Sequence, residues 1–170
     1  MNSDMCVMCD DGIINIRVGA IIMKDGKVLM VENSNHDYYY SVGGRIKFGE
    51  RAEDAVVREV FEETGARLDV DRLLYVAENY FIGDSPAKAG RIVYELSFYY
   101  LMKTPRDFEP TCQSVTEDGY SEFLRWVDLD TDKTIYPAFF KTELLSITDG
   151  VKFFSIDERQ KNDQKKTSIF

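Results

Sequence analysis

Hydrophobic and polar residues alternate in short runs along the first third of the chain, which is the pattern of β-strands. Two such runs are Ile14 to Ala20 and Ile21 to Val31, and Asp25-Gly26 inside the second is typical of a two-residue hairpin turn. The sequence therefore predicts that, after a polar start, the domain opens with an antiparallel strand pair. Tyr38 to Val42 is another β-prone run, and we expect Gly43-Gly44 to stop it.

The pattern becomes helical near Glu50 and returns to strands further on. The predicted helix runs to about Thr64, with Gly65 as its left-handed C-terminal cap. Strand-like runs follow at Val70 to Phe81, Ile92 to Met102 and Phe123 to Val127.

A second helix is predicted from Pro137. Phe140, Leu144 and Ile147 lie on it at i, i+4 and i+7, the spacing of a face buried against a sheet. Val151 to Ile156 is expected to be a final short strand. Strands interleaved with two helices predict an α/β fold, a mixed sheet covered on both faces.

Composition indicates one domain with an acidic surface. The 170 residues suffice for a single core, which we assign to residues 1–156, followed by a polar tail at residues 157–170. Thirty acidic against 21 basic residues give a net charge of −9, which argues against DNA binding. An acidic protein still binds an anionic substrate where local basic residues or a bound cation reverse the potential.

Cysteine content and hydropathy predict a reducing, cytoplasmic location. Cys6, Cys9 and Cys112 are too few for a disulfide framework, and no membrane span or signal peptide is recognisable. With His36 they make four soft ligands, enough on paper for zinc, but their spacing favours reduced thiols.

The segment with the clearest chemistry is Gly44 to Ala66, which reads GRIKFGERAEDAVVREVFEETGA. Helical geometry places Glu59, Glu62 and Glu63 within about a 100° arc. Like charges at this spacing destabilise a helix, and no Lys stands one turn away to neutralise them. A solvated helix face is one explanation, and a bound Mg²⁺ or Mn²⁺ is the other.

Neighbouring residues bear on that choice. Val57, Val60 and Phe61 occupy the opposite arc, so we expect them to face the core. Ala52 and Ala55 share the carboxylate side, where small residues are expected to leave room for a cation and phosphates.

Basic residues and glycines near this segment are candidates for substrate contacts. Gly43-Gly44 allows close backbone approach and offers a carbonyl to a metal. Arg45, Lys47 and Arg51 are candidates for binding phosphate oxygens. Arg17 is another candidate for a diphosphate, although an exposed ion pair explains it equally well.

The segment resembles the Nudix box: Gly, five residues, Glu, seven residues, Arg-Glu, an aliphatic residue, any residue, Glu-Glu, any residue, Gly and an aliphatic residue. Those positions are held by Gly44, Glu50, Arg58, Glu59, Val60, Glu62, Glu63, Gly65 and Ala66. Seven fixed positions at about 7% background each give a chance match on the order of 10⁻⁸ per window. The departures, Ala66 for a larger aliphatic residue and Val42 for the Pro often found before Gly-Gly, spare the carboxylates.

The resemblance implies a Nudix-like α/β/α sandwich in which the box forms a loop-helix-loop. It also implies a Mg²⁺- or Mn²⁺-dependent hydrolase that cleaves the phosphoanhydride of a nucleoside diphosphate linked to another group. Glu59, Glu62, Glu63 and the Gly43 carbonyl would then be metal ligands. Glu50 would orient the site or hold a second ion, and Arg58 would orient the carboxylates.

A catalytic base and the substrate are less defined. In many Nudix enzymes the base comes from the box helix or from an acid on a later loop, where Glu117, Asp118 and Glu122 lie; we favour Glu117. A nucleotide sugar, ADP-ribose and a nucleoside triphosphate all remain open as substrates. The alternatives are a Nudix-fold nucleotide-sugar sensor without activity and an RNA 5′-end pyrophosphohydrolase, which the acidic charge disfavours. A homodimer is also expected.

Overall fold

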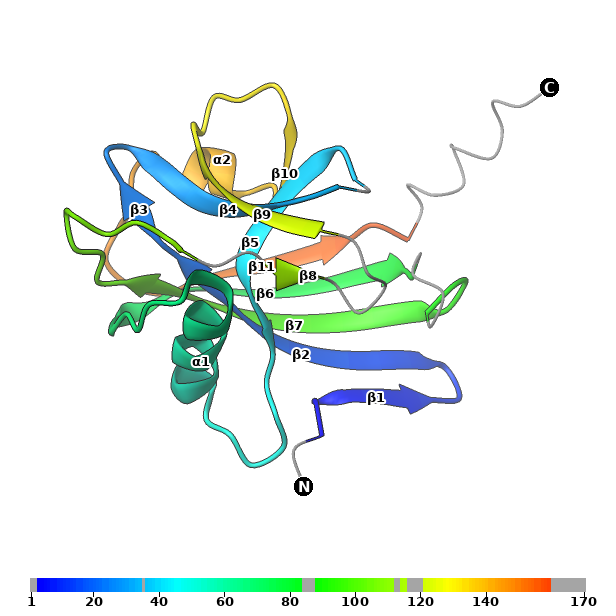
Figure 1. Ribbon diagram of the computed structural model, residues 1–170. Coiled ribbons are helices and arrows are strands. Elements are labelled where there is room, and N and C mark those ends of the chain that lie inside the picture. The colour runs from blue at the N-terminus through cyan, green and yellow to red at the C-terminus, as the bar shows by residue number, and fades with distance from the viewer. Residues whose placement is uncertain (1–2, 35, 84–87, 112–113, 116–120, 160–170) are drawn as a thin grey trace.

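The computed structural model describes residues 3–34, 36–83, 88–111, 114–115 and 121–159 (Figure 1). The elements are β1 (Cys6–Cys9), β2 (Gly12–Ile21), β3 (Met23–Lys24), β4 (Lys27–Asn33), β5 (Tyr38–Arg45), α1 (Ala52–Thr64), β6 (Val70–Ile82), β7 (Ile92–Met102), β8 (Ser114–Val115), β9 (Ser121–Val127), β10 (Thr134–Tyr136), α2 (Phe140–Glu143) and β11 (Lys152–Asp157).

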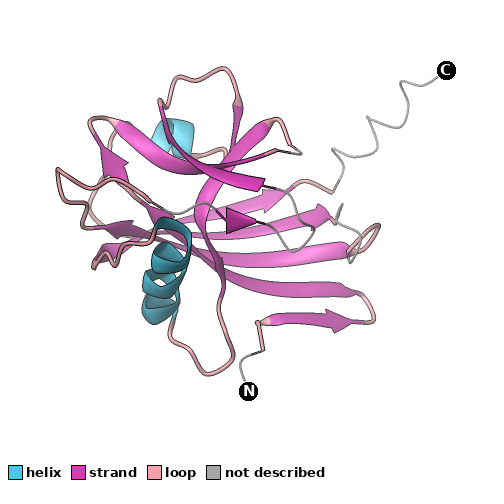
Figure 2. Cartoon of the chain, in the orientation of Figure 1, coloured by secondary structure: helices cyan, strands magenta, loops and turns pink. Residues whose placement is uncertain are grey.

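Within the described ranges the strands form one mixed sheet, as predicted. The main order is β11-β6-β7-β2-β5-β4-β9-β8, with β1 added to β2, β3 to β4 and β10 to β5. Strand pairs β2/β7, β6/β11 and β5/β10 are parallel, whereas the pairs flanking β4 are antiparallel. Figure 2 shows that strands dominate the fold and that α1 is much longer than α2.

Each face of the sheet carries its own core because side chains alternate along a strand. On β4, Leu29 and Val31 enter the core under α1, while Val28 and Met30 enter the core under α2. Helix α1 buries Ala55, Val56 and Val60, and the α2 segment buries Phe140 and Leu144. The two clusters confirm the α/β/α sandwich.

Two local predictions are confirmed by backbone geometry. Asp25 and Gly26 both have positive φ, 51° and 77°, and join β3 to β4 as a tight hairpin. Gly65 ends α1 at a φ of 74°, and its N–H donates to the carbonyl of Phe61 at 2.9 Å.

The N-terminal half also departs from expectation in two places. The predicted polar start contains strand β1, which pairs antiparallel with β2. Strand β5 does not stop at Gly43-Gly44 but runs through it, because Gly43 and Gly44 pair with Gly19 and Val18 of β2. Long-range pairing supplies the hydrogen bonds that local propensity does not indicate.

The predicted second helix is much shorter than expected. Only Phe140–Glu143 is helical, and Ile147 packs against the core from the loop that follows. Ser146, Thr148 and Gly150 are poor helix formers, so the i, i+4, i+7 pattern is met by one helical turn and a loop. Neither helix in the described ranges is long and apolar enough to cross a membrane.

Candidate functional site

Helix α1 lies with two of its carboxylates against a glycine pair of the sheet. A Cβ atom on Gly44 would collide with the carboxyl group of Glu59, so only glycine permits this approach. Gly43 has a φ of 140°, a region that favours glycine, and its N–H donates to Glu63 Oε1 at 3.2 Å. The glycine pair therefore lets the helix carboxylates reach the backbone of β5.

The buried face of α1 differs from the predicted arc. Phe61 was expected in the core, yet it is 55% exposed, which makes that prediction wrong. Ala55 is fully buried and Ala52 packs against the same core, so these small residues let the helix sit close to the sheet. The expectation that they also leave room for a cation stays a prediction.

Glu63 is the most perturbed carboxyl group of this cluster. Its Oε2 is buried and, within the described part of the chain, has no hydrogen-bond partner. Burial raises the pKa of Glu63 to about 8, the Gly43 N–H opposes this, and nearby Glu59 and Glu122 add to it. Burial also raises the pKa of Glu59.

Arg58 connects the other acids of the box. Its guanidinium donates to both oxygens of Glu50 at 2.8 and 2.9 Å, to Glu59 at 2.6 Å and to Glu62 at 3.1 Å. Another bond, 3.0 Å long, reaches the carbonyl of Arg45. These bonds to Arg58 lower the pKa of Glu50, which also accepts the N–H of Lys47. Arg58 thus fixes the positions of the Glu50, Glu59 and Glu62 side chains.

The predicted metal ligands are held apart in this arrangement. Among the described residues, no three His, Cys, Asp or Glu side chains converge closely enough to hold a metal ion. Arg58 holds Glu59 and Glu62, whereas Glu63 turns to the N–H of Gly43. The donors are nevertheless hard oxygens, and the unpartnered, desolvated Oε2 of Glu63 fits Mg²⁺ or Mn²⁺.

The predicted phosphate-binding residues fall into two groups. Arg17 donates to the Gly43 carbonyl at 3.5 Å and lies within electrostatic reach of Glu59 and Glu63. Arg45 pairs with Asp4 at 3.2 Å, beside Arg17.

The second group consists of Lys47 and Arg51, whose side chains form no hydrogen bond or ion pair with Glu59 or Glu63 in the described part of the chain. Lys47 contributes its backbone N–H to Glu50, as described above. The side chain of Arg51 is 81% exposed at the start of α1, with Glu53 at 3.9 Å.

The favoured base, Glu117, lies outside the described residues, as does Asp118. Glu122 is described and stands at the start of β9, where it accepts a hydrogen bond from the Tyr40 hydroxyl. Its charge also acts on Glu63. Sequence pattern does not predict this contact between Tyr40 and Glu122, since only the pairing of β4 with β5 and with β9 brings the two side chains together.

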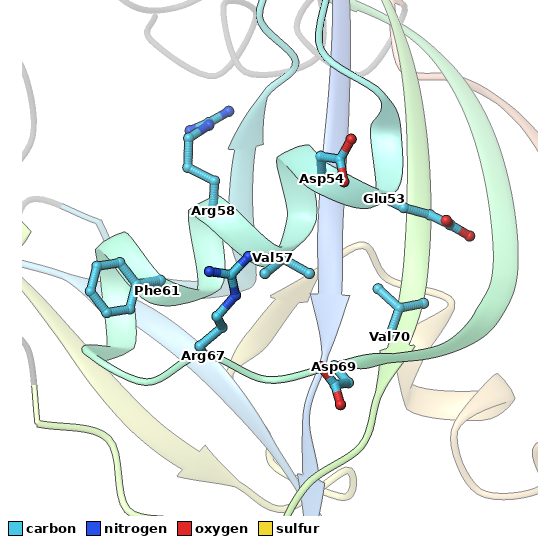
Figure 3. A pocket seen from close by; sticks show the side chains of 8 residues that line it. All are labelled: Glu53, Asp54, Val57, Arg58, Phe61, Arg67, Asp69 and Val70. Carbon is cyan, nitrogen blue, oxygen red and sulfur yellow. The ribbon is translucent and has the colours of Figure 1, made fainter.

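A cavity of about 480 Å³ lies on the opposite flank of α1. Figure 3 shows that its side chains come from α1 and the segment after it, with Arg67 extending toward the helix. The lining residues are Glu53, Asp54, Val57, Arg58, Phe61, Arg67, Asp69 and Val70. Arg58 is the one member of the carboxylate network among them. The cavity therefore adjoins the network through Arg58, but Glu59 and Glu63 do not line it.

Comparisons with known proteins identify the family of this chain. A family model described as NUDIX domain matches residues 14–138. An ADP-ribose pyrophosphatase from Methanocaldococcus jannaschii is 41% identical over 64 residues, 36% of this chain and 38% of that protein. A MutT-like protein from Streptomyces ambofaciens is 36% identical over 61 residues, 36% of this chain and 40% of that protein. The alignments thus span about two fifths of these relatives.

Among solved structures, a MutT NUDIX hydrolase from Burkholderia pseudomallei is similar to this chain. The TM-score is 0.57 at 25% identity, covering 78% of this chain and 98% of that one. The region that the family model matches, residues 14–138, covers the box, helix α1 and most or all of the strands β2, β5 and β7 that α1 contacts. The chain therefore belongs to the NUDIX family.

Proposed function

We propose that this protein is a divalent-cation-dependent pyrophosphohydrolase that cleaves the phosphoanhydride bond of a nucleoside diphosphate linked to another moiety. The observation that carries the proposal is Glu63, a half-buried side chain beside Gly43 whose Oε2 is buried and has no hydrogen-bond partner among the described residues. Family membership and the activities named for the relatives support it. Cytoplasmic location and a homodimer remain predictions from the sequence.

In this proposal Glu59, Glu62, Glu63 and the Gly43 carbonyl hold Mg²⁺ or Mn²⁺. The bound cation supplies charge neutralisation at the phosphates and lowers the pKa of an attacking water. Arg58 orients Glu59 and Glu62 through the bonds described above, and Glu50 fixes Arg58 from the other side. Unpaired carboxylates this close together repel one another, so Arg58 also stabilises the site before the cation binds.

Proton transfer and substrate binding use the surrounding residues. Glu122, which the Tyr40 hydroxyl holds near Glu63, is placed to accept a proton from water. Glu117 stays a second candidate for this role. Arg17 and Arg45 bind phosphate oxygens, whereas the exposed Arg51 is expected to contribute little.

The test is product analysis across a panel of nucleotide sugars, ADP-ribose, dinucleotides and nucleoside triphosphates, with Mg²⁺, Mn²⁺ or EDTA. We expect a nucleoside monophosphate or a related phosphate product from one class, formed with either cation and absent in EDTA. Binding of a nucleotide sugar without any turnover would contradict the proposal and favour a sensor. Turnover that persists in EDTA would contradict the cation dependence.

A further inference from the structure

Three aromatic rings form a corner at the start of β5, the strand that carries the glycine pair of the box. The rings of His36 and Tyr38 stack, with centroids 4.9 Å apart and an angle of 18° between their planes. Tyr136 of β10 meets Tyr38 edge-to-face, at 5.1 Å and 89°. Because β10 pairs in parallel with the first half of β5, the rings come together from distant parts of the sequence (Figure 1). We call His36, Tyr38 and Tyr136 the aromatic corner.

The aromatic corner differs from the ring cluster on the other face of the sheet. Under α2, Tyr99, Phe139 and Phe140 contact one another in the core, where Tyr99 is 8% exposed and Phe140 is fully buried. In the aromatic corner, by contrast, Tyr136 is 41% exposed and His36 is exposed as well. The buried rings stabilise the fold, whereas the exposed rings offer flat apolar surface to a ligand.

The aromatic corner lies on the same face of β5 as the core under α1. Side chains alternate along a strand, so Tyr38 shares its face with Tyr40, which packs against that core. Tyr40 donates to Glu122, and further along the same strand the Gly43 N–H donates to Glu63. Tyr38 and Gly43 are five positions apart, about 17 Å along an extended strand. An elongated nucleotide whose phosphoanhydride lies at Glu63 can therefore extend its base toward the aromatic corner.

The angle between the rings suits a planar ligand. A base that lies parallel to Tyr136 is perpendicular to Tyr38, so it stacks on the first ring and meets the second edge-to-face. Aromatic rings favour both of these arrangements. A phosphate or a sugar has no aromatic face and gains neither contact. The aromatic corner therefore fits the base end of a nucleotide rather than the group that is linked to its diphosphate.

We propose that Tyr136, together with His36 and Tyr38, forms a subsite on which the nucleobase of the substrate stacks, and that Tyr136 is its main stacking surface. The inference rests on the proposed function of the box carboxylates. Tyr136 lies outside the box and binds the substrate without taking part in bond cleavage. Since every nucleobase has an aromatic face, the subsite accepts purines and pyrimidines alike.

The experiment compares two ligands by calorimetry in the presence of Ca²⁺: α,β-methylene-ADP, and methylenediphosphonate, which lacks the nucleoside. Tyr136→Ala should weaken binding of α,β-methylene-ADP about tenfold, as expected for the loss of one stacked base, and leave methylenediphosphonate binding unchanged. Tyr136→Leu keeps an apolar side chain for packing and should show the same loss, whereas Tyr136→Phe should retain wild-type binding. Phe153→Ala removes an exposed ring from β11 and is the matched control, in which both affinities should stay unchanged.

Unchanged affinity for α,β-methylene-ADP in folded Tyr136→Ala or Tyr136→Leu would overturn the subsite, as would equal weakening of both ligands. Turnover of the substrate panel by the wild type separates this inference from the proposed function. A loss of nucleotide binding specific to the Tyr136 variants, without turnover of any compound, would leave the subsite standing while the hydrolase proposal fails. Turnover combined with nucleotide binding that is independent of Tyr136 would leave the hydrolase and remove the subsite.

Discussion

The two flanks of α1 are both acidic, but they differ in what surrounds the acids. On the flank facing β5, Glu59 has a side chain only 13% exposed, and Glu63 has a buried oxygen without a partner in the described ranges. On the other flank, Glu53 has a side chain 57% exposed and lines an open cavity of about 480 Å³ with Phe61 and Arg67.

The two flanks thus differ in desolvation: the carboxylates that we propose as cation ligands are shielded from water, whereas the acids beside the larger cavity are exposed. Charges in water are screened, so the acids around the outer cavity interact weakly with any ligand. Beneath β5, water is excluded and the pKa of Glu63 rises to about 8, because the carboxylate form lacks solvation. A cation bound there would compensate for the lost hydration of the Glu63 carboxylate, whereas Glu53 remains hydrated.

The largest expected effect is the difference in kcat between two variants, each with one glutamate replaced on one flank of α1. Glu63→Gln should lower kcat by about 10³-fold or more, because the amide cannot serve as an anionic ligand. Its thermal stability should equal or exceed that of the wild type, since a buried carboxylate is removed. Glu53→Gln is the matched control and should change kcat by less than about twofold, because Glu53 is exposed. Equal losses in both variants would erase the distinction between the flanks.

The spacing between α1 and β5 can be tested by adding one methyl group. In Gly44→Ala the new Cβ collides with the Glu59 carboxyl, which must move away from Arg58. We expect a loss of about 1 kcal/mol or less in the free energy of unfolding, because the atoms that must shift lie at the end of the Glu59 side chain. The fall in kcat should be about 10- to 100-fold, typical of misplaced ligands.

A second substitution shows whether the clash causes this damage. Gly44→Ala combined with Glu59→Ser has room for the methyl group, so stability should recover while kcat stays low. A Gly44→Ala variant with wild-type kcat and stability would show that the close approach is unimportant for the site.

Local pattern was sufficient to predict the parts of the molecule in which neighbours in sequence decide the structure. The α1 helix ends at Thr64 with Gly65 as its cap, as predicted, because helical period and capping act within a few residues. The spacing of the box likewise identified Glu59 and Glu63, which the structure places against Gly43 and Gly44 of β5. Their roles as ligands remain predictions.

Features that depend on distant pairing were missed. Helical spacing placed Phe61 in the core. The sheet instead buries Val60 and leaves Glu59 and Glu63 half-buried, while Phe61 is exposed. Tyr40 meets Glu122 only because β4 lies between their strands, 82 residues apart in sequence. No local rule relates such positions, so a single sequence cannot reveal them.

The smallest expected effect is a pH dependence that only the inner flank should produce. The pKa of Glu63 is raised from 4.5 to about 8, so the folded chain binds more protons than the unfolded chain between these values. Metal-free stability should therefore fall as pH rises through this range. The fall should be smaller in Glu63→Gln, where only Glu59, whose pKa burial also raises, still contributes from this flank. Glu50, whose pKa is lowered, acts only below this window.

Mg²⁺ should reverse that loss, because a cation stabilises the ionised form of Glu63 and binds the folded state. Melting temperatures measured in EDTA and in Mg²⁺ should differ by about 4 °C or more above pH 8, and by less near pH 5. In Glu53→Gln the same difference should persist, whereas in Glu63→Gln it should shrink at both pH values. A Mg²⁺ effect that is independent of pH, or equal in the two variants, would place the cation away from the buried flank.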